Sequence, residues 1–280
     1  MSIKFISWNV NGFRAAAASG HLATLVRNHK PDVLCVQEIK CTEDELARAA
    51  DMYVPELTTQ YERFVLSSAV KGRHGVAMFI KTSVIQRNGE YFSIPYDGVD
   101  PLVDGNNESR LQMIQVFDTL IINTYSVNVR QNLSRIPQRK VYDDVLSSYV
   151  SGWNQQGLGP VIVLGDLNVV AEAIDYHGGR INESLAGMTR SERDSFSSLK
   201  ESGKLVDSFR HLYPEDSGVY SYWSYRGYAR ESNKGWRIDY ALVSESLQDK
   251  ILDADVLMET GGSDHAPIIL ELDFSLEVNN

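Results

Sequence analysis

Oxygen-bearing side chains follow three apolar, β-branched runs of the sequence, shortly after the point where each run ends. They are Asn9, Glu38, Asp166 and Asn168. Carboxylate and amide oxygens are the ligands that hard cations such as Mg²⁺ and Mn²⁺ prefer. A lone Asn or Asp in such a place more often caps a turn, but the repetition of the pattern weakens that alternative. We therefore expect these strand ends to converge on a divalent metal site.

A carboxylate and an imidazole lie next to each other near the C-terminus, as Asp264 and His265. Adjacent residues of a strand point to opposite faces, so both reach one site only from an irregular turn, which the glycines at 261–262 permit. A lone His is more often structural. Asp239, however, lies inside another apolar run and needs a charged or hydrogen-bonding partner if it is buried. An Asp-oriented His is an arrangement that handles charge at a reacting centre.

Motifs of several other enzyme classes are absent from the sequence. It contains no Gly-x-Ser-x-Gly elbow, no Gly-x-x-x-x-Gly-Lys-Ser/Thr phosphate loop and no Gly-x-Gly-x-x-Gly motif. Serine hydrolases, nucleotide hydrolases and dinucleotide enzymes of the usual kinds are therefore disfavoured. A His, an Asp and hard-metal oxygens without a nucleophile leave metal-assisted attack by water, whose commonest use is phosphoester hydrolysis.

The overall charge argues against general attraction to nucleic acid, because 27 Lys and Arg face 37 Asp and Glu, a net charge of −10. Cations nevertheless gather in residues 127–140 and 226–237. Solvated surface loops are the alternative explanation for either segment. The aromatic run 220–225 and Trp236 offer flat faces for a sugar or a base. Alternating aromatics are more often core, but the interleaved cations favour a nucleic-acid surface.

A β-rich framework must position these groups. Apolar runs predict strands at 3–7, 33–36, 63–66, 76–80, 111–117, 120–124, 161–164, 238–243 and 268–272. Helical patterns lie at 20–29, 43–52, 133–152 and 189–203. Two of the helices open with capping boxes, at Thr42 and Thr189, and the second of these ends at Gly203. Residues 3–9 and 161–168 resemble each other as strands that end in a polar side chain, as in a two-halved sandwich with one shared cleft.

The composition suits one globular α/β domain, since 43% of the 280 residues are hydrophobic and 23% are charged. We place this domain at 1–275, with a short tail at 276–280. No apolar run approaches the roughly 18 residues of a membrane span, and the start lacks the plan of a signal peptide. We therefore expect a cytoplasmic monomer without a membrane attachment. Cys35 and Cys41 suit neither a disulfide framework nor a zinc site, and we expect both to be reduced and structural.

Seven short motifs, in order along the chain, resemble the exonuclease III family of apurinic/apyrimidinic endonucleases, within the endonuclease/exonuclease/phosphatase superfamily. They are Trp-Asn-Val-Asn-Gly at 8–12, Gln-Glu-Ile-Lys at 37–40, Gly-Val-Ala at 75–77, Gly-Asp-Leu-Asn at 165–168, Tyr-Trp-Ser-Tyr-Arg at 222–226, Gly-Trp-Arg-Ile-Asp at 235–239 and Gly-Ser-Asp-His at 262–265. The resemblance implies a deoxyribonuclease I-like α/β fold. This is a four-layer sandwich in which two mixed β-sheets pack face to face, flanked by helices, with a cleft at one end.

The resemblance also implies a metal site. Asn9 and Glu38 look like metal-site residues, with Glu38 the main ligand of Mg²⁺ and Asp264 near the same ion. Mn²⁺ is the alternative cation. Asn11 falls where relatives often carry Asn or Asp near the metal, and we count it among the substrate-binding residues.

Catalytic roles follow from the same resemblance. Asp166 resembles the residue that orients or deprotonates the attacking water, while Asn168 and Tyr125 resemble those that hold the phosphate. His265, oriented by Asp239, resembles the residue that stabilises the developing charge. These roles are physically consistent, because positioned donors and a dication lower the energy of a transition state with extra charge on the phosphate oxygens.

Substrate contacts are expected from aromatic and basic side chains. Tyr222, Trp223 and Trp236 look like the pocket for a flipped-out abasic sugar, in the segment that ends at Arg226. We expect Arg226 to bind substrate as well.

Backbone phosphates are expected to meet Lys40, Arg73 and the cations of 130–140. Asn128 matches the substrate-binding position of the family, although Val127 stands where relatives carry a proline.

The expected activity is that of a Mg²⁺-dependent DNA-repair phosphodiesterase. It would cut 5′ to abasic sites in double-stranded DNA, with 3′-5′ exonuclease and 3′-end trimming activity. One alternative keeps the fold but moves the substrate to RNA or a small phosphoester, and the aromatic segment argues against the small molecule. A non-catalytic nucleic-acid-binding relative would have lost residues of the catalytic set, and none is lost here. The sequence ranks neither endonuclease against exonuclease nor one metal ion against two.

Overall fold

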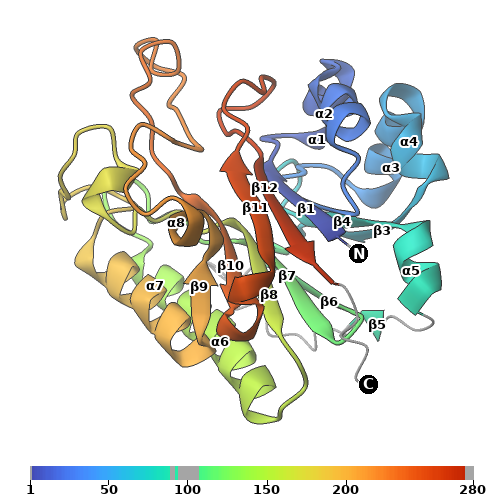
Figure 1. Cartoon of the computed structure of the whole chain (residues 1–280). Coiled ribbons are helices and arrows are strands. Elements are labelled where there is room, and N and C mark those ends of the chain that lie inside the picture. Colours follow the sequence, from blue (N-terminus) through green and yellow to red (C-terminus); the bar gives the residue numbers. More distant parts are fainter. Residues whose placement is uncertain (1, 89–91, 94–106, 275–280) are drawn as a thin grey trace.

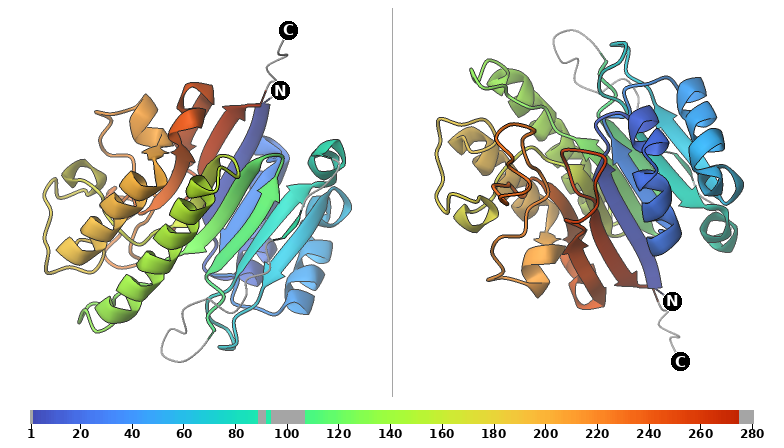
Figure 2. Two further views of the ribbon diagram at one scale, coloured as in Figure 1. Left: turned by 90° about the horizontal axis from the view of Figure 1, so that it is seen from below. Right: turned by 90° about the horizontal axis from the view of Figure 1, so that it is seen from above.

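The computed structural model describes residues 2–88, 92–93 and 107–274, which form two β-sheets lying face to face with helices on both outer sides (Figure 1 and Figure 2). This arrangement confirms the four-layer sandwich of mixed sheets predicted from the sequence. The predicted tail at 276–280 lies outside the described residues. Across the described ranges, no helix has both the length and the apolar character that crossing a membrane requires.

Each sheet is built around one central parallel pair of strands, β1 with β2 and β7 with β8, and its other pairs are antiparallel. In spatial order, the first sheet contains β11 (Ile251–Val256), β12 (Ile268–Asp273), β1 (Ser2–Asn9), β2 (Val33–Gln37), β4 (Val76–Lys81) and β3 (Tyr61–Leu66). The second contains β5 (Phe92–Ser93), β6 (Leu111–Val116), β7 (Thr119–Tyr125), β8 (Val161–Asp166), β10 (Asp239–Ser244) and β9 (Leu205–Asp207).

Helices cover the outer faces of the two sheets (Figure 2). Those over the first sheet are α1 (Phe13–Ala18), α2 (His21–His29), α3 (Glu43–Tyr53) and α4 (Pro55–Thr59). Those over the second are α6 (Ile136–Gln155) and α7 (Arg190–Gly203). The other helical elements are α5 (Thr82–Asn88), η1 (Ala173–Asp175), α8 (Ser208–Leu212) and η2 (Glu245–Lys250).

Alternation along the central strands divides the apolar side chains among the layers. In β1, Phe5 belongs to the core between the sheets, whereas Ile6 belongs to the core under the helices. In β2, Cys35 and Leu34 divide in the same way. Both faces of β2 are covered, so its sequence is almost uniformly apolar instead of alternating with polar residues. The predicted state of Cys35 and Cys41 is confirmed, since both are free and buried.

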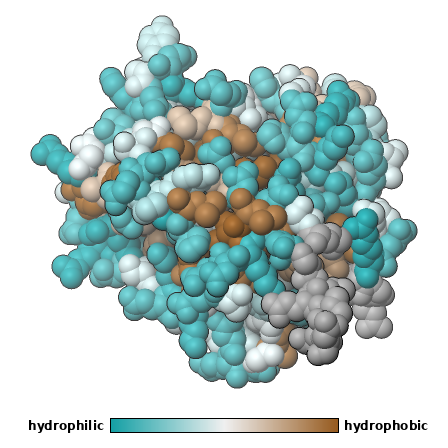
Figure 3. All heavy atoms as spheres, in the orientation of Figure 1, coloured by the Kyte–Doolittle hydropathy of each residue, from teal (hydrophilic) through white to brown (hydrophobic). Residues whose placement is uncertain are grey.

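All the predicted strands and helices form, but the structure adds elements that the sequence patterns did not reveal. The added strands are β5, β9 and β11, and the added helices are α1, α4, α5 and α8. Most are short. The edge strand β11 was missed because Asp253 and Asp255 interrupt its apolar pattern, and charges of this kind protect an exposed sheet edge from pairing with other chains. On the face shown in Figure 3, apolar side chains reach the surface over β11 and β12, where Leu252 is exposed.

Both predicted capping boxes are present, and the one at Thr42 yields a stability prediction. The Thr42 hydroxyl accepts a hydrogen bond from the Glu45 N–H, and the Glu45 carboxylate accepts one from the Thr42 N–H. Thr42→Ala should lower the free energy of unfolding by about 1 kcal/mol, because helix α3 loses its first-turn acceptor. Urea unfolding measures this loss.

The matched control is Thr24→Ala. Thr24 is exposed within α2, and its hydroxyl contacts only the carbonyl of the preceding turn, Gly20 O. Alanine favours the helix at that position, so this variant should be as stable as the parent or slightly more stable. Equal destabilisation of the two variants would contradict the capping role.

Candidate active site

A cavity of about 720 Å³ opens at the end of the sandwich where the central parallel strands finish, uppermost in Figure 1. Strands β2, β7 and β8 deliver polar groups there from both sheets. The predicted site residues that line it are Glu38, Tyr125, Asn128, Asp166, Asn168, Tyr222, Trp236, Asp264 and His265. The structure thus brings together residues that lie far apart in the sequence, as the shared-cleft hypothesis predicted.

Glu38 is held as an ionised carboxylate. Asn9 donates from Nδ2 to its Oε1 at 3.0 Å, the Lys40 ammonium lies 2.6 Å from its Oε2, and the Tyr125 hydroxyl donates to the same carboxylate. Burial alone would raise the pKa of Glu38, but Lys40 and these hydrogen bonds outweigh it and lower the pKa to about 2. Glu38 therefore presents a full negative charge at any physiological pH.

Asn11 connects Glu38's neighbour Lys40 with Asp264. Its Nδ2 donates to Asp264 Oδ1 at 2.9 Å, and its Oδ1 accepts a hydrogen bond from Lys40 Nζ. The Lys40 ammonium thus contacts Glu38 and Asn11, while Asn9 and Asp264 are linked to these two residues by hydrogen bonds. This donor set fits a hard divalent ion, for which oxygen ligands are preferred.

Asp166 ends strand β8 and is fully buried. Asn9 Nδ2 donates to its Oδ2 at 3.0 Å, so one amide of β1 bridges Glu38 and Asp166 across the two sheets. Burial raises the pKa of Asp166, with His265 opposing and Asp239 reinforcing that rise. A carboxyl group with a raised pKa is suited to accepting a proton from water.

The close approach of β8 to β7 before Asp166 requires a glycine. At Gly165, φ is +146°, and an added Cβ would lie 1.9 Å from the Thr124 carbonyl oxygen. Beyond Asp166, Asn168 donates from Nδ2 to Ser126 O at 3.0 Å and accepts at Oδ1 from Asn128 Nδ2 at 3.0 Å. These bonds fix the two amides at the cavity wall.

His265 and Asp239 form the predicted pair. His265 Nδ1 lies 2.8 Å from Asp239 Oδ2, and His265 Nε2 lies 3.8 Å from Asp166 Oδ2. Burial lowers the pKa of His265, but the carboxylates of Asp239 and Asp166 more than compensate and raise it to about 10. The imidazole is therefore a buried cation at neutral pH. The Tyr222 ring packs on it, with centroids 4.9 Å apart.

Asp166, Asp239 and His265 also offer ligand atoms that all lie within 4.8 Å of one another. The His265 nitrogen on the Asp239 side is already hydrogen-bonded, and the cluster carries its own positive charge. The oxygens of Glu38 and Asp264 are therefore the better place for a metal ion.

Trp223 does not lie where the sequence predicted. Only 2% of its surface is exposed, and its indole donates to Asn233 Oδ1 at 3.1 Å. The adjacent Tyr222 forms backbone β-bridges with Trp236 and His265, and its side chain lines the cavity. Successive residues of an extended segment point to opposite sides, which sends Trp223 into the core.

The basic segments are less exposed than predicted. Arg139 is buried against Asp143 and donates to the carbonyls of 127, 167 and 168. Arg135 is buried against Glu108, and Arg237 is buried between Asp175 and Asp207. These guanidinium groups hold loops together and are not available to phosphates. They correct the expectation that all cations of 130–140 contact DNA.

Other predicted contacts lie outside the cavity or at its edge. Arg73 and Arg226 are exposed on turns and do not line it, whereas Arg130 does. The wall formed by 185–187 has little signal in the sequence. Gly187 is the one signal there, since its φ of +81° favours glycine.

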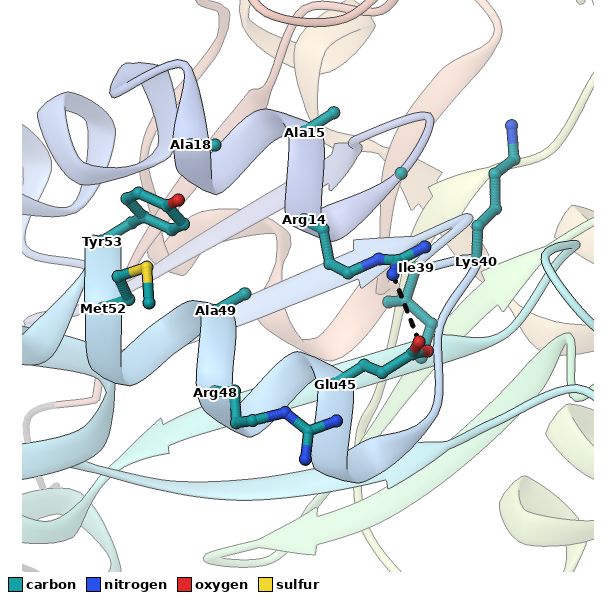
Figure 4. Close-up of a pocket in the computed structure, with 11 residues that line it drawn as sticks. Arg14, Ala15, Ala18, Ile39, Lys40, Glu45, Arg48, Ala49, Met52 and Tyr53 are labelled. Atoms are coloured by element: carbon teal, nitrogen blue, oxygen red, sulfur yellow. Dashed lines mark hydrogen bonds and ion pairs between the residues drawn. The ribbon is translucent and has the colours of Figure 1, made fainter.

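A second hollow, of about 700 Å³, lies between α1 and α3 and adjoins the site only at Lys40 (Figure 4). Its lining includes the small or apolar side chains of Ala15, Ala49 and Met52, and the ion pair of Arg14 with Glu45 joins the two helices. It lacks the converging carboxylates and imidazole that mark the first cavity.

Comparisons with known proteins agree with this geometry. Residues 6–265 match the Endonuclease/Exonuclease/phosphatase family. The chain is 37% identical to "Exodeoxyribonuclease" of Bacillus subtilis, covering 96% of this chain and 98% of that protein. It is 35% identical to "DNA repair nuclease APEX1" of Danio rerio, covering 97% and 82%. Among solved structures, the AP endonuclease LMAP from Leishmania major matches with a TM-score of 0.84 at 28% identity, covering 98% of this chain and 88% of that one. The 3′-5′ exonuclease NExo from Neisseria meningitidis matches with a TM-score of 0.78 at 25% identity, covering 97% and 100%.

The charge on His265 generates a prediction. Its pKa should be about 10 in the parent and should fall in Asp239→Asn, because the main opposite charge is removed. NMR titration of the His265 ring nitrogens, assigned with His265→Gln, measures both values. A parent His265 that titrates near its ordinary value, about 6.5, would contradict the assigned pairing.

The same shift predicts how stability depends on pH. When folding raises the pKa of a histidine, the charged form stabilises the folded state. This contribution is complete at pH values below the pKa in the unfolded state, and it is lost as pH rises toward the pKa in the folded state. The free energy of unfolding of the parent should therefore decline between about pH 6.5 and pH 10, and that of Asp239→Asn should decline less steeply.

Proposed function

This chain belongs to the endonuclease/exonuclease/phosphatase family, and within it to the exonuclease III family of AP endonucleases; from this premise we propose that it cuts the DNA backbone 5′ to abasic sites and removes residues from 3′ ends, with Mg²⁺. It is a hydrolytic DNA-repair nuclease. The observation that carries the proposal is the convergence of Glu38, Asp166 and His265, from both sheets, in one cavity.

Glu38 and Asp264 would hold Mg²⁺, with Asn9 and Asn11 beside them. The ion would supply positive charge that stabilises negative charge on the phosphate oxygens. Mn²⁺ would serve the same purpose, since it takes the same oxygen ligands.

The chain's own residues account for the remaining requirements of phosphodiester hydrolysis. Asp166 orients the attacking water and takes up its proton. His265, kept cationic by Asp239, donates to the phosphate oxygen on which charge develops, and Asn168 and Tyr125 fix the phosphate on the other side. Because these donors are already hydrogen-bonded in place, little reorganisation is needed when charge appears.

Selection of the lesion is assigned to the aromatic wall. Tyr222 and Trp236 face the cavity from neighbouring segments, and Tyr176 packs edge-on against Trp236 at 5.1 Å. An abasic sugar lacks a base, so it can be turned out of the duplex at a lower cost in free energy than a complete nucleotide. Arg130 at the rim, with Lys40, Arg73 and Arg226 beyond it, would contact the backbone phosphates.

We further propose that residues 1–275 act as one domain and that the protein works as a cytoplasmic monomer. Every group assigned to the site comes from a single chain, and the two free cysteines suit a reducing compartment.

The central test uses a labelled duplex with one abasic analogue and an intact control duplex, each with Mg²⁺ and with EDTA. We expect a single Mg²⁺-dependent cut 5′ to the analogue, together with shortening from the 3′ ends. Glu38→Gln should require far more Mg²⁺ for the same rate. If neither duplex is cut and RNA is cut instead, the assignment of DNA as the substrate is overturned.

The two tryptophans should separate binding from stability. Trp236→Ala should weaken binding of the abasic duplex by about 10-fold, because a stacking wall is removed. Trp223→Ala should instead lower the free energy of unfolding by about 3–5 kcal/mol, because it leaves a cavity in the core. Fluorescence anisotropy and urea unfolding measure the two effects. Unchanged lesion binding by Trp236→Ala would remove that residue from the pocket.

A further inference from the structure

Four buried or half-buried polar side chains surround the catalytic tyrosine without lining the cavity. We call them the Glu108 cluster: His74, Glu108, Arg110 and Arg135. Glu108 contacts Arg110 Nε at 2.5 Å from Oε2, and its Oε1 lies 3.0 Å from Arg135 Nη2 and 3.2 Å from His74 Nε2. Arg110 Nη2 also lies 2.8 Å from His74 Nδ1. The cluster is therefore a closed network.

Arg110 connects this network to Tyr125. Its guanidinium carbon lies 4.2 Å from the centroid of the Tyr125 ring, and its Nη1 donates to Tyr125 O at 3.0 Å. The His74 ring also lies 6.0 Å from the same aromatic ring. One side chain thus contacts both the ring face and the backbone of Tyr125.

The members of the cluster come from three separate parts of the fold. His74 precedes β4 of the first sheet, Glu108 and Arg110 precede β6 of the second, and Arg135 caps α6. Backbone bonds reinforce the junction, from Gly75 N to Glu108 O and from Tyr125 N to Arg110 O. Contacts from segments of both sheets therefore hold Tyr125 in place.

Stability alone is a poor explanation for this arrangement. Burying charged groups costs free energy, and apolar side chains of similar size would stabilise such a place as well or better. Arg110 is 1% exposed, so it does not offer its charge to solvent. The cluster holds the planar guanidinium of Arg110 at fixed points, and this guanidinium in turn fixes the plane of the Tyr125 ring that it covers.

We infer that Arg110, locked by Glu108, Arg135 and His74, is a positioning residue that fixes the place of the Tyr125 hydroxyl beside Glu38, where the phosphate would bind. This inference rests on the proposed function, in which Tyr125 holds the phosphate. Arg110 acts through Tyr125, and its Nη1 also donates to the next carbonyl, Ser126 O, at 3.3 Å. Lysine in its place would keep the charge but lose the planar contact and the fork of donors.

A double-mutant cycle tests this dependence. Arg110→Lys should lower kcat for cleavage of the abasic duplex by about 10-fold to 100-fold, with KM changed by less than about 2-fold, because positioning acts in the transition state. In the Tyr125→Phe background, where the ring remains but the hydroxyl is gone, Arg110→Lys should cost less than about 3-fold more. Equal losses in both backgrounds would overturn the inference. Tyr61→Phe, which loses a buried hydrogen bond to Pro31 O far from the site, controls for destabilisation and should keep the parental kcat.

A second measurement does not depend on activity. In protein labelled with ζ-¹³C tyrosine, the Tyr125 signal, assigned with Tyr125→Phe, should shift or broaden in Arg110→Lys and stay in place in Tyr61→Phe. If Arg110→Lys does not fold, Glu108→Gln should perturb the same signal by loosening Arg110. An unperturbed Tyr125 signal would overturn the inference. A parent protein that cuts no DNA would instead refute the proposed function, while the NMR comparison would still decide the role of Arg110.

Discussion

The site depends on keeping several carboxylates buried and close together. Glu38, Asp166, Asp239 and Asp264 would repel one another if their charges were not compensated. Fixed donors supply the compensation: Lys40 beside Glu38, His265 between Asp166 and Asp239, and the Asn9 amide between Glu38 and Asp166. Glu38 is kept ionised in this way, whereas burial still raises the pKa of Asp166. A dense negative charge that is held in place attracts a dication, and the cationic imidazole beside it attracts a phosphate.

The paired sheets explain how a single amide can serve both halves. Strands β1 and β8 are central in their sheets and end at the same level, each beside a parallel neighbour. Behind the site, Gln37 donates to Ser7 Oγ and to Asn123 Oδ1, both at 2.8 Å, and so joins the sheets through buried hydrogen bonds. Apolar contacts alone would allow the sheets to slide, whereas these directional bonds specify one relative position.

The sequence predicted features that arise from local patterns. The central strands, the capping boxes at Thr42 and Thr189, and the polar residues at strand ends are of this kind, because each depends on neighbours along the chain. The pairing of His265 with Asp239 could also be predicted, since a buried carboxylate requires a partner. The resemblance to a known family added the order of the motifs and the roles of their residues.

What could not be predicted depends on contacts between distant segments. Arg135 and Arg139 look like solvated cations in sequence, yet each is buried by acids and carbonyls supplied by the fold. The Glu108 cluster has no local signature, since Arg110 meets a residue 36 positions away and Glu108 one 27 positions away. Trp223 and Trp236 are equally aromatic, and only the direction of an irregular segment separates the core from the cavity.

The direction of the segment with Tyr222 and Trp223 limits where the chain can gain or lose residues. Tyr222 is pinned on one side by Trp236 and on the other by His265, and Trp223 fills the space behind it. Insertions or deletions at 226–228, where the side chains are exposed, would fall in a surface turn. A single residue added or removed within the pinned segment would exchange the two side chains, placing an indole in the cavity and a tyrosine hydroxyl in the core. Homologous chains should therefore differ in the length of the turn but keep an unbroken spacing at this dipeptide.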